Sequence, residues 1–227
     1  MVSTSHAMLA RRSFMVGSAA TGIVALSGCQ SMGGYSFTEA IRRLLQLSSE
    51  NAFARLTASG GFWDSQVARL ALPDLFGSRG GVMARILTSG AFREQLQRRL
   101  NYVAEDGARR AAPVVADTVR TIGIDNAVAL IRGGPTAATS FLRQGMGPGL
   151  INAMIPALGE SLRISSDPVI GQAISALTGV DIGSVAQAVA NSADNAIWYQ
   201  IGEEESAIRA NPERTNDPLL IAVLKAL

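Results

Sequence analysis

The apolar residues of the chain recur mostly every three or four positions, which is the spacing of a helix face rather than of a strand. Behind the Ser-x-x-Glu sequence of residues 36–39, a pattern typical of a helix start, apolar positions continue at this spacing to Leu56. The same spacing predicts further helices over residues 74–89, 91–112, 113–122, 150–162, 168–179, 182–208 and 219–227. The longest should be the helix that Asp181 caps and that Asn211-Pro212 ends. The pattern therefore predicts an all-α fold, an irregular multi-helix bundle in a single domain.

One segment, residues 61–73, lacks the helical period and ends at a proline. Apolar and polar positions alternate weakly over residues 67–72, so we expect one short extended arm in the otherwise helical domain. Its adjacent aromatic residues, Phe62 and Trp63, are expected to fill the core.

The clearest helix boundaries lie between Ile122 and Arg143. Asp125 is placed to cap a short helix, and Gly133 is placed to end it in the left-handed conformation. Pro135 then opens a second helix, because its restricted φ suits the first helical position. The segment therefore predicts two helices joined by a Gly-Gly-Pro corner.

The first residues of the chain have the features of an export leader. Arg11 and Arg12, followed by Phe14 and a weakly apolar run to Leu26, resemble a twin-arginine signal. This apolar run is shorter than the roughly twenty residues that a membrane-spanning helix needs. We therefore predict a cleaved signal peptide over residues 1–28, with the general secretory route as the alternative to twin-arginine export.

The leader ends at a sequence that resembles the lipobox of bacterial lipoproteins, Leu26-Ser27-Gly28-Cys29. In such proteins the cysteine thiol receives a diacylglycerol and becomes the N-terminus of the mature chain. Cys29 is therefore the predicted lipid attachment site, residues 29–35 form a lipidated tether, and residues 36–227 form one helical domain. Gln30 follows the cysteine where an aspartate would favour retention in the inner membrane, so we expect an anchor in the outer membrane that faces the periplasm.

Removal of the leader changes the charge of the protein. With Arg11 and Arg12 gone, 18 basic residues remain against 18 acidic ones, so a nucleic-acid partner is not expected. The charge is uneven along the chain, because residues 39–143 carry fourteen arginines against nine acids and residues 144–227 carry four basic residues against nine acids.

The predicted mature domain also lacks two reactive residue types. The only histidine, His6, lies in the leader, and the only cysteine is the acylation site. This excludes Ser-His-Asp and Cys-His nucleophile systems and the usual zinc sites, so no cofactor or metal is expected. Carriage of a metal or small ligand through oxygen atoms is a further possibility.

Several short sequences together resemble the bacterial domain-of-unknown-function family 4197, whose members are small, helical, exported proteins and often lipoproteins. The resemblance rests on Leu100-Asn101 with Ala104-Glu105, Ala112-Pro113, Arg132-Gly133-Gly134 with Ala137-Ala138-Thr139, Glu203-Glu204-Glu205, and Ile208-Arg209-Ala210-Asn211-Pro212 with Arg214-Thr215. It implies an exported helical protein and no particular activity, so the roles of these residues stay open.

Two functions fit these observations. The first is a lipid-anchored, non-enzymatic envelope protein that binds a partner or plays a structural part. The alternative is a hydrolase or lyase on an envelope substrate, in which two carboxylates from the set Asp125, Glu105, Glu203, Glu204 and Glu205 act as acid and base. Adjacent helix residues point about 100° apart, so we interpret the glutamate triplet as a solvated face whose Glu205 pairs with Arg209, four residues on.

The uneven charge suggests one long-range contact. Arg132 lies in the predicted last turn of its helix, where a cation complements the free carbonyls. We hypothesise that the two oppositely charged parts dock with Arg132 facing the turn of Glu203 to Glu205. The competing interpretation is that Arg132 only caps its own helix in solvent.

Overall fold

The computed structural model describes residues 31–32, 35–72, 90–164, 171 and 182–226 of the chain. The predicted leader, Cys29, the helices expected over 74–89 and 168–179, and the proposed Asp181 cap lie outside these residues.

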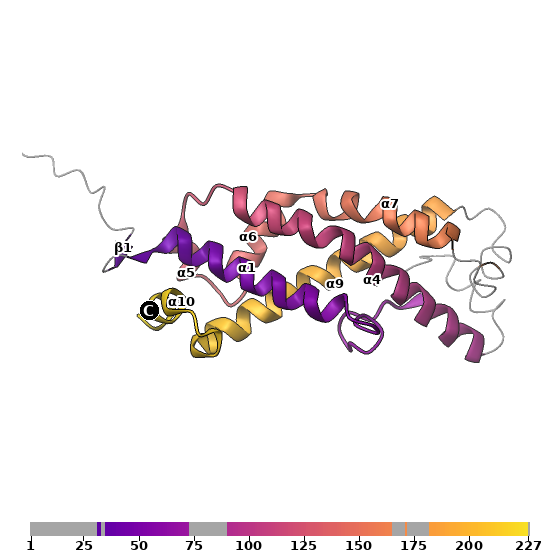
Figure 1. Cartoon of the computed structure of the whole chain (residues 1–227), viewed down its shortest axis with the longest axis horizontal. Helices are drawn as coiled ribbons and strands as arrows, with labels where there is room; N and C mark the ends of the chain where they lie inside the picture. The colour runs from indigo at the N-terminus through magenta and orange to yellow at the C-terminus, as the bar shows by residue number, and fades with distance from the viewer. Residues whose placement is uncertain (1–30, 33–34, 73–89, 165–170, 172–181, 227) are drawn as a thin grey trace, which may run out of the picture.

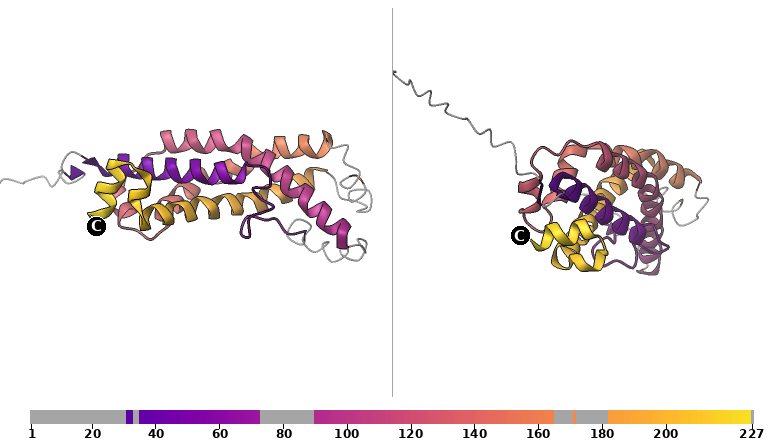
Figure 2. Two further views of the ribbon diagram at one scale, coloured as in Figure 1. Left: turned by 60° about the horizontal axis from the view of Figure 1, so that its bottom comes forward. Right: turned by 60° about the vertical axis from the view of Figure 1, so that its left-hand side comes forward.

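Four long helices form an elongated bundle: α1 (Phe37–Leu56), α4 (Gly90–Thr121), α7 (Gly149–Ile164) and α9 (Ile182–Ala210). Shorter helices lie toward the end of the bundle where α1 begins, namely α5 (Ala127–Ile131), α6 (Ala137–Met146), the 3₁₀ turn η2 (Pro212–Thr215) and α10 (Pro218–Lys225) (Figures 1 and 2). Ahead of α1, β1 (Ser31–Met32) pairs antiparallel with β2 (Tyr35–Ser36), with Ser31 opposite Ser36. The predicted all-α, single-domain bundle is confirmed.

Helix α1 packs against the long helices α4 and α9 and also contacts the shorter helices α5, α6 and α10. It begins where the sequence predicts, since the Ser36 hydroxyl accepts a hydrogen bond from the Glu39 N–H at 3.3 Å. Its buried face consists of Phe37, Ala40, Ile41, Leu44, Leu45, Ser48, Ser49, Ala52, Phe53 and Leu56. Apart from Ser48 and Ser49 these side chains are apolar, and removing them from water is the main force that holds the neighbouring helices against α1.

The basic edge of α1 is used for contacts within the protein. Arg42 donates to backbone carbonyls at the end of α4, including Arg120 O at 2.7 Å. The next residue, Arg43, pairs with Asp217 ahead of α10 at 2.8 Å. Both arginines thus link α1 to distant segments, as expected of a core helix.

Helix α4 corrects two predictions. It runs through Pro113 without a break, although the sequence predicts a new helix there. Proline lacks the N–H that would bond to the preceding turn, but Ala111 and Val115 on either side are both fully buried, so packing keeps the helix continuous. Its 32 residues also exceed the 29 of α9, so the prediction that α9 is the longest helix was wrong.

The Gly-Gly-Pro corner forms as two short helices, but its boundaries differ from those predicted. Asn126 caps α5 instead of Asp125, by accepting from Ala129 N. Gly133 does not adopt a left-handed conformation; among the described glycines only Gly60 and Gly147 have positive φ. A Cβ on Gly133 would lie 2.6 Å from the Ala137 Cβ, so glycine is needed there for close approach. Helix α6 begins at Ala137, two residues after Pro135.

The predicted arm is non-helical, but it folds as successive turns where an extended chain was expected. The Asp64 N–H donates to Gly60 O at 2.7 Å, which bends the chain directly after α1. Phe62 is fully buried as predicted, whereas Trp63 is only partly buried and lies between the guanidinium groups of Arg69 and Arg98, 4.5 and 4.6 Å from its ring centre. Two cation–π contacts therefore hold this tryptophan at the edge of the core.

Candidate functional site

The glutamate triplet of α9 lies at a crossing of helices, with α1 on one side and α6 on the other. Glu203 is exposed, but Glu204 and Glu205 are buried. The prediction of a solvated face was therefore wrong for two of the three residues. The spacing of apolar residues in α9 could not predict that Glu204 and Glu205 are buried, because neighbouring helices cover them.

On the α6 side, Glu205 takes the place of a missing helix cap. The capping residue of α6, Thr136, makes no side-chain hydrogen bond to the helix. The Glu205 carboxylate accepts instead from Ala138 N at 3.0 Å and from both the N–H and the hydroxyl of Thr139 at 2.6 Å. A carboxylate suits this position, because the free N–H groups and the dipole at a helix N-terminus favour negative charge.

Arg209 performs the complementary task at the end of α5. Its guanidinium donates to Leu130 O at 2.9 Å and to Ile131 O at 2.8 Å, and its Nε donates to Glu205 at 2.8 Å. The predicted Glu205–Arg209 pair is thus confirmed. This one pair on α9 contacts the start of α6 and the end of α5. The side chain of Glu205 is 0% exposed and that of Arg209 is 12% exposed, so the contact is shielded from solvent and stabilises the fold.

The contact proposed for Arg132 is wrong. Arg132 is exposed and makes no ion pair with any residue that the structure describes. The corner does dock on the acidic turn of α9, but Arg209 on α9 itself provides the cation. Arg132 is the C-capping residue of α5 in a surface position.

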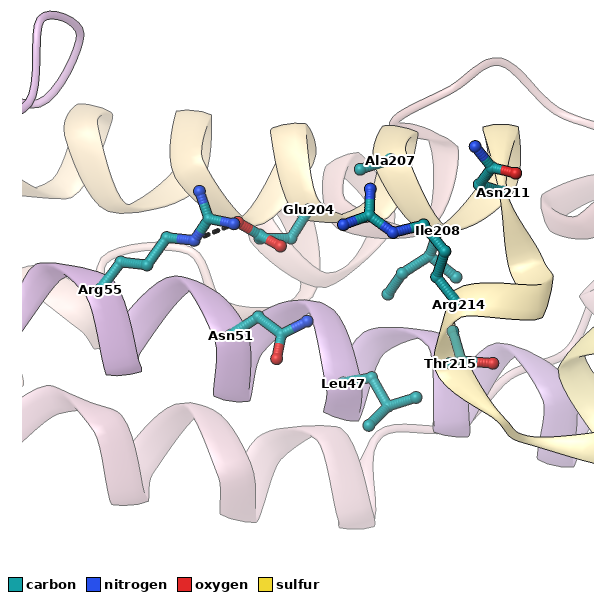
Figure 3. A pocket seen from close by; sticks show the side chains of 9 residues that line it. All are labelled: Leu47, Asn51, Arg55, Glu204, Ala207, Ile208, Asn211, Arg214 and Thr215. Carbon is teal, nitrogen blue, oxygen red and sulfur yellow. Dashed lines mark ion pairs between the residues drawn. The ribbon is translucent and has the colours of Figure 1, made fainter.

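On the opposite side of α9, Glu204 faces a groove between α1, α9 and η2 (Figure 3). The cavity has a volume of about 290 Å³. It is lined by Leu47, Asn51 and Arg55 of α1, by Glu204, Ala207, Ile208 and Asn211 at the end of α9, and by Arg214 and Thr215 of η2. Five of these residues, Glu204, Ile208, Asn211, Arg214 and Thr215, belong to the motifs that the sequence singled out. They come from one stretch of the chain, and the fold places α1 opposite them to complete the groove.

The buried carboxylate in the groove is held by one exposed arginine. Arg55 Nε lies 3.0 Å from Glu204 Oε1, and the Gln200 amide donates to the same oxygen at 3.3 Å. The Glu204 side chain is 8% exposed and that of Arg55 is 70% exposed. The two terminal nitrogens of Arg55 form no hydrogen bond with the described residues, so they can donate to a molecule in the groove.

Hydrogen bonds of Thr215 stabilise the η2 turn that carries Arg214. The Thr215 hydroxyl donates to Pro212 O at 2.7 Å and accepts from Asp217 N at 3.1 Å. Burial alone would raise the pKa of Asp217, but the hydrogen bond from Arg43 and two backbone N–H groups bring this pKa below its usual value. Asp217 therefore stays ionised, and the turn stays attached to α1.

The Arg214 side chain extends from η2 across the groove toward α9 (Figure 3). Its guanidinium forms no ion pair or hydrogen bond with the residues that the structure describes.

The carboxylates proposed for catalysis do not converge. Glu204 and Glu205 serve opposite sides of α9, Asp125 is exposed in a loop, and Glu105 is buried in α4 beside residues 60–62. Burial raises the pKa of Glu105, and one of its oxygens lacks a hydrogen-bond partner, yet it does not line the groove. Among the described residues, no three His, Cys, Asp or Glu side chains are grouped so that they could hold a metal ion.

Three residues of the site were not predicted from the sequence: Asn51, Arg55 and Gln200. Asn51 and Arg55 lie four residues apart, which places them on one face of α1, and this spacing was the available signal. The signal is weak, because their partners lie about 150 residues later in the chain.

Comparisons with known proteins give one match. The family model described as "Protein of unknown function (DUF4197)" matches residues 31–225. No curated protein and no solved structure matches the chain. Within the described residues, no helix is long and apolar enough to span a bilayer.

Proposed function

Given that the chain belongs to the DUF4197 family of proteins of unknown function, we propose that it is a lipid-anchored envelope protein and that the groove between α1, α9 and η2 is its binding site. In this proposal Cys29 carries the acyl chains in the outer membrane, and the domain faces the periplasm. The groove binds a partner or a small envelope component and does not transform it. The observation that carries the proposal is that five motif residues of one stretch, Glu204 to Thr215, line a single cavity together with α1.

The chemistry of the groove supports binding over catalysis. General acid–base hydrolysis needs two groups that exchange protons with the substrate, commonly a pair of carboxylates. The lining contains a single carboxylate, Glu204, which is already paired with Arg55. The chain beyond Cys29 also contains no histidine and no further cysteine, so the usual nucleophile systems are unavailable to the domain.

In this proposal the short tether sets which end of the domain lies near the membrane. Helix α1 begins at Phe37, eight residues after Cys29, and α10 and the C-terminal residues lie at the same end of the bundle (Figure 1). An acylated Cys29 therefore holds this end close to the membrane surface. Two or more acyl chains give a stable anchor, whereas one gives marginal binding.

The anchor is tested by metabolic labelling with an alkyne fatty acid. The wild-type chain should carry the label, and Cys29→Ala should abolish it. Persistence of the label in Cys29→Ala would contradict the assignment. Replacing Arg11 and Arg12 together by lysine tests the export route separately, since twin-arginine export should stop and general secretion should continue.

The binding site is tested by placing a photo-crosslinking residue at Asn51 in the groove of the full-length protein in intact envelopes. The matched control is the same residue at Glu50, which is exposed on α1 and does not line the groove. A discrete adduct that forms from position 51 and not from position 50 supports the groove as the binding site. Equal adducts from both positions, or none from either, would overturn it.

A further inference from the structure

The residues that line the groove carry a net charge of +1. Arg55 and Arg214 contribute two positive charges, and Glu204 contributes one negative charge. The Nε of Arg55 lies closest to Glu204, and the terminal nitrogens of Arg55 form no hydrogen bond with the described residues. The guanidinium of Arg214 forms neither a hydrogen bond nor an ion pair with them. A ligand with a single negative charge would neutralise the groove.

The charge balance favours a carboxylate over a phosphate. A guanidinium can make a two-point contact with two oxygens of either anion, so its geometry does not discriminate between them. A phosphate would carry a second negative charge into a cavity where the buried Glu204 already supplies one, and the two would repel each other.

The other side chains that line the groove could contact a peptide through hydrogen bonds and apolar surface. Asn211 offers an amide with donors and an acceptor, which complement the C=O and N–H groups of a peptide bond. Leu47 and Ile208 supply apolar surface for a small side chain. The volume of about 290 Å³ lies at the lower end of the range for ligand pockets, about 300 to 1,000 Å³, so the groove fits the end of a peptide better than a large cofactor.

From these features we infer that the groove binds the C-terminal carboxylate of a short peptide with small side chains. Arg214 is the residue that holds the carboxylate. Arg55 donates to it from the other side while its Nε keeps Glu204 in place. This inference rests on the proposed binding function and names the class of ligand.

The test is a calorimetric titration of the full-length protein in detergent with four probes. N-acetyl-Ala-Ala has the peptide and the carboxylate, N-acetyl-Ala-Ala-amide lacks the carboxylate charge, acetate lacks the peptide, and inorganic phosphate offers a different anion. N-acetyl-Ala-Ala should bind most tightly. The amide should bind at least about tenfold more weakly, as expected for loss of a charge-assisted hydrogen bond. Acetate and phosphate should also bind at least about tenfold more weakly, because they lack the peptide group that the groove contacts.

Two variants locate the contact. Arg214→Gln should weaken binding of N-acetyl-Ala-Ala at least about tenfold, and Arg214→Lys, which keeps the charge and loses the planar fork, should retain part of the affinity. Arg110→Gln is the control, because Arg110 is an exposed arginine that does not line the groove. Since Arg214 is exposed, the thermal unfolding of both Arg214 variants should match the wild type.

Equal affinity for the acid and its amide, tighter binding of phosphate or acetate, or an unchanged affinity in Arg214→Gln would each overturn the inference. Failure of all four probes would also overturn it. If position 51 still gives its specific crosslink in that case, the groove remains the binding site and only the ligand class is wrong. Loss of both results would reject the groove itself.

Discussion

Two adjacent glutamates of α9 have opposite surroundings. Glu205 is fully buried, and its oxygens accept from three groups of α6 and from Arg209. Glu204, one residue earlier, is buried as well, but its partner Arg55 is 70% exposed and opens onto a groove. Burial of a carboxylate alone therefore does not distinguish a structural site from a binding site. In this protein the two sites differ in the exposure of the partner arginine, and the site with the exposed arginine is the one proposed to bind a ligand.

We call the Glu205–Arg209 contact with α5 and α6 the closed side of α9, and the Glu204–Arg55 pair with its groove the open side. The closed side has little capacity to bind a ligand. Arg209 uses its guanidinium on Glu205 and on two carbonyls of α5. The open side leaves donors on Arg55 and Arg214 without partners in the described part of the chain. We expect changes on the closed side to affect stability, and changes on the open side to affect binding.

The largest predicted effect is on the closed side. Glu205→Ala leaves Arg209 buried without its partner and removes the acceptor for the free N–H groups of α6. We expect a loss of roughly 3 to 5 kcal/mol in the free energy of unfolding, measured by urea denaturation.

Glu203→Ala is the control for this measurement, because it removes a glutamate from the same turn at an exposed position. It should change stability by less than about 0.5 kcal/mol. If Glu205→Ala were as mild as Glu203→Ala, the closed contact would not hold the corner, and the contrast between the two sides would fail.

An intermediate effect is expected at the corner that the closed side holds. In Gly133→Ala the new Cβ would lie 2.6 Å from the Ala137 Cβ and 3.0 Å from Ala129 O, so the corner must shift. Overpacking of this kind costs about 1 to 3 kcal/mol. We expect thermal unfolding to show a lower melting temperature for Gly133→Ala than for Gly134→Ala.

Gly134 is the matched control, because nothing lies within 4 Å of a Cβ built there. Gly134→Ala should cause no loss of stability. Equal destabilisation by the two substitutions would show that backbone flexibility limits the corner and that close packing does not.

The smallest effect is expected on the open side. A double-mutant cycle between Arg55→Ala and Glu204→Ala should give a coupling energy of about 0 to 1 kcal/mol, because Arg55 is largely exposed and solvent screens the pair. A cycle between Arg132→Ala and Glu205→Ala serves as the reference for residues without direct contact and should fall below about 0.5 kcal/mol. A coupling of several kcal/mol for Arg55 and Glu204 would mean that the open side is a structural contact as well.

Local patterns predicted much of the fold. The period of apolar residues located α1, α9 and α10, and the Ser36 cap follows from a four-residue sequence. The Glu205–Arg209 pair follows from a spacing of four residues. Boundaries were less accurate: Asn126 caps α5 where Asp125 was expected, since both residue types can cap and one position decides between them.

The candidate site was predicted only in part. Sequence motifs pointed to Glu204, Ile208, Asn211, Arg214 and Thr215, whose closeness in the chain already groups them, but gave no sign that α1 forms the other side of the groove. Arg55 was not predicted, because an exposed arginine on a helix looks the same in sequence whether or not a groove lies beside it. The contact assigned to Arg132 was wrong for a related reason: the charge balance of the two halves requires some cation near the glutamates but does not identify which.

What the sequence alone determined is local: the helical class, several helix starts, the one pair at a spacing of four residues, and the motifs that later meet in the groove. The tertiary structure decided which of three consecutive glutamates is exposed, which is closed off by α6, and which faces α1 across the groove. The physical reason is that helix periodicity depends on neighbours within a turn, whereas burial and charge pairing depend on which helices pack together. Arg55 and Glu204 are separated by about 150 residues of chain, and only the packing of α1 on α9 brings their side chains to 3.0 Å.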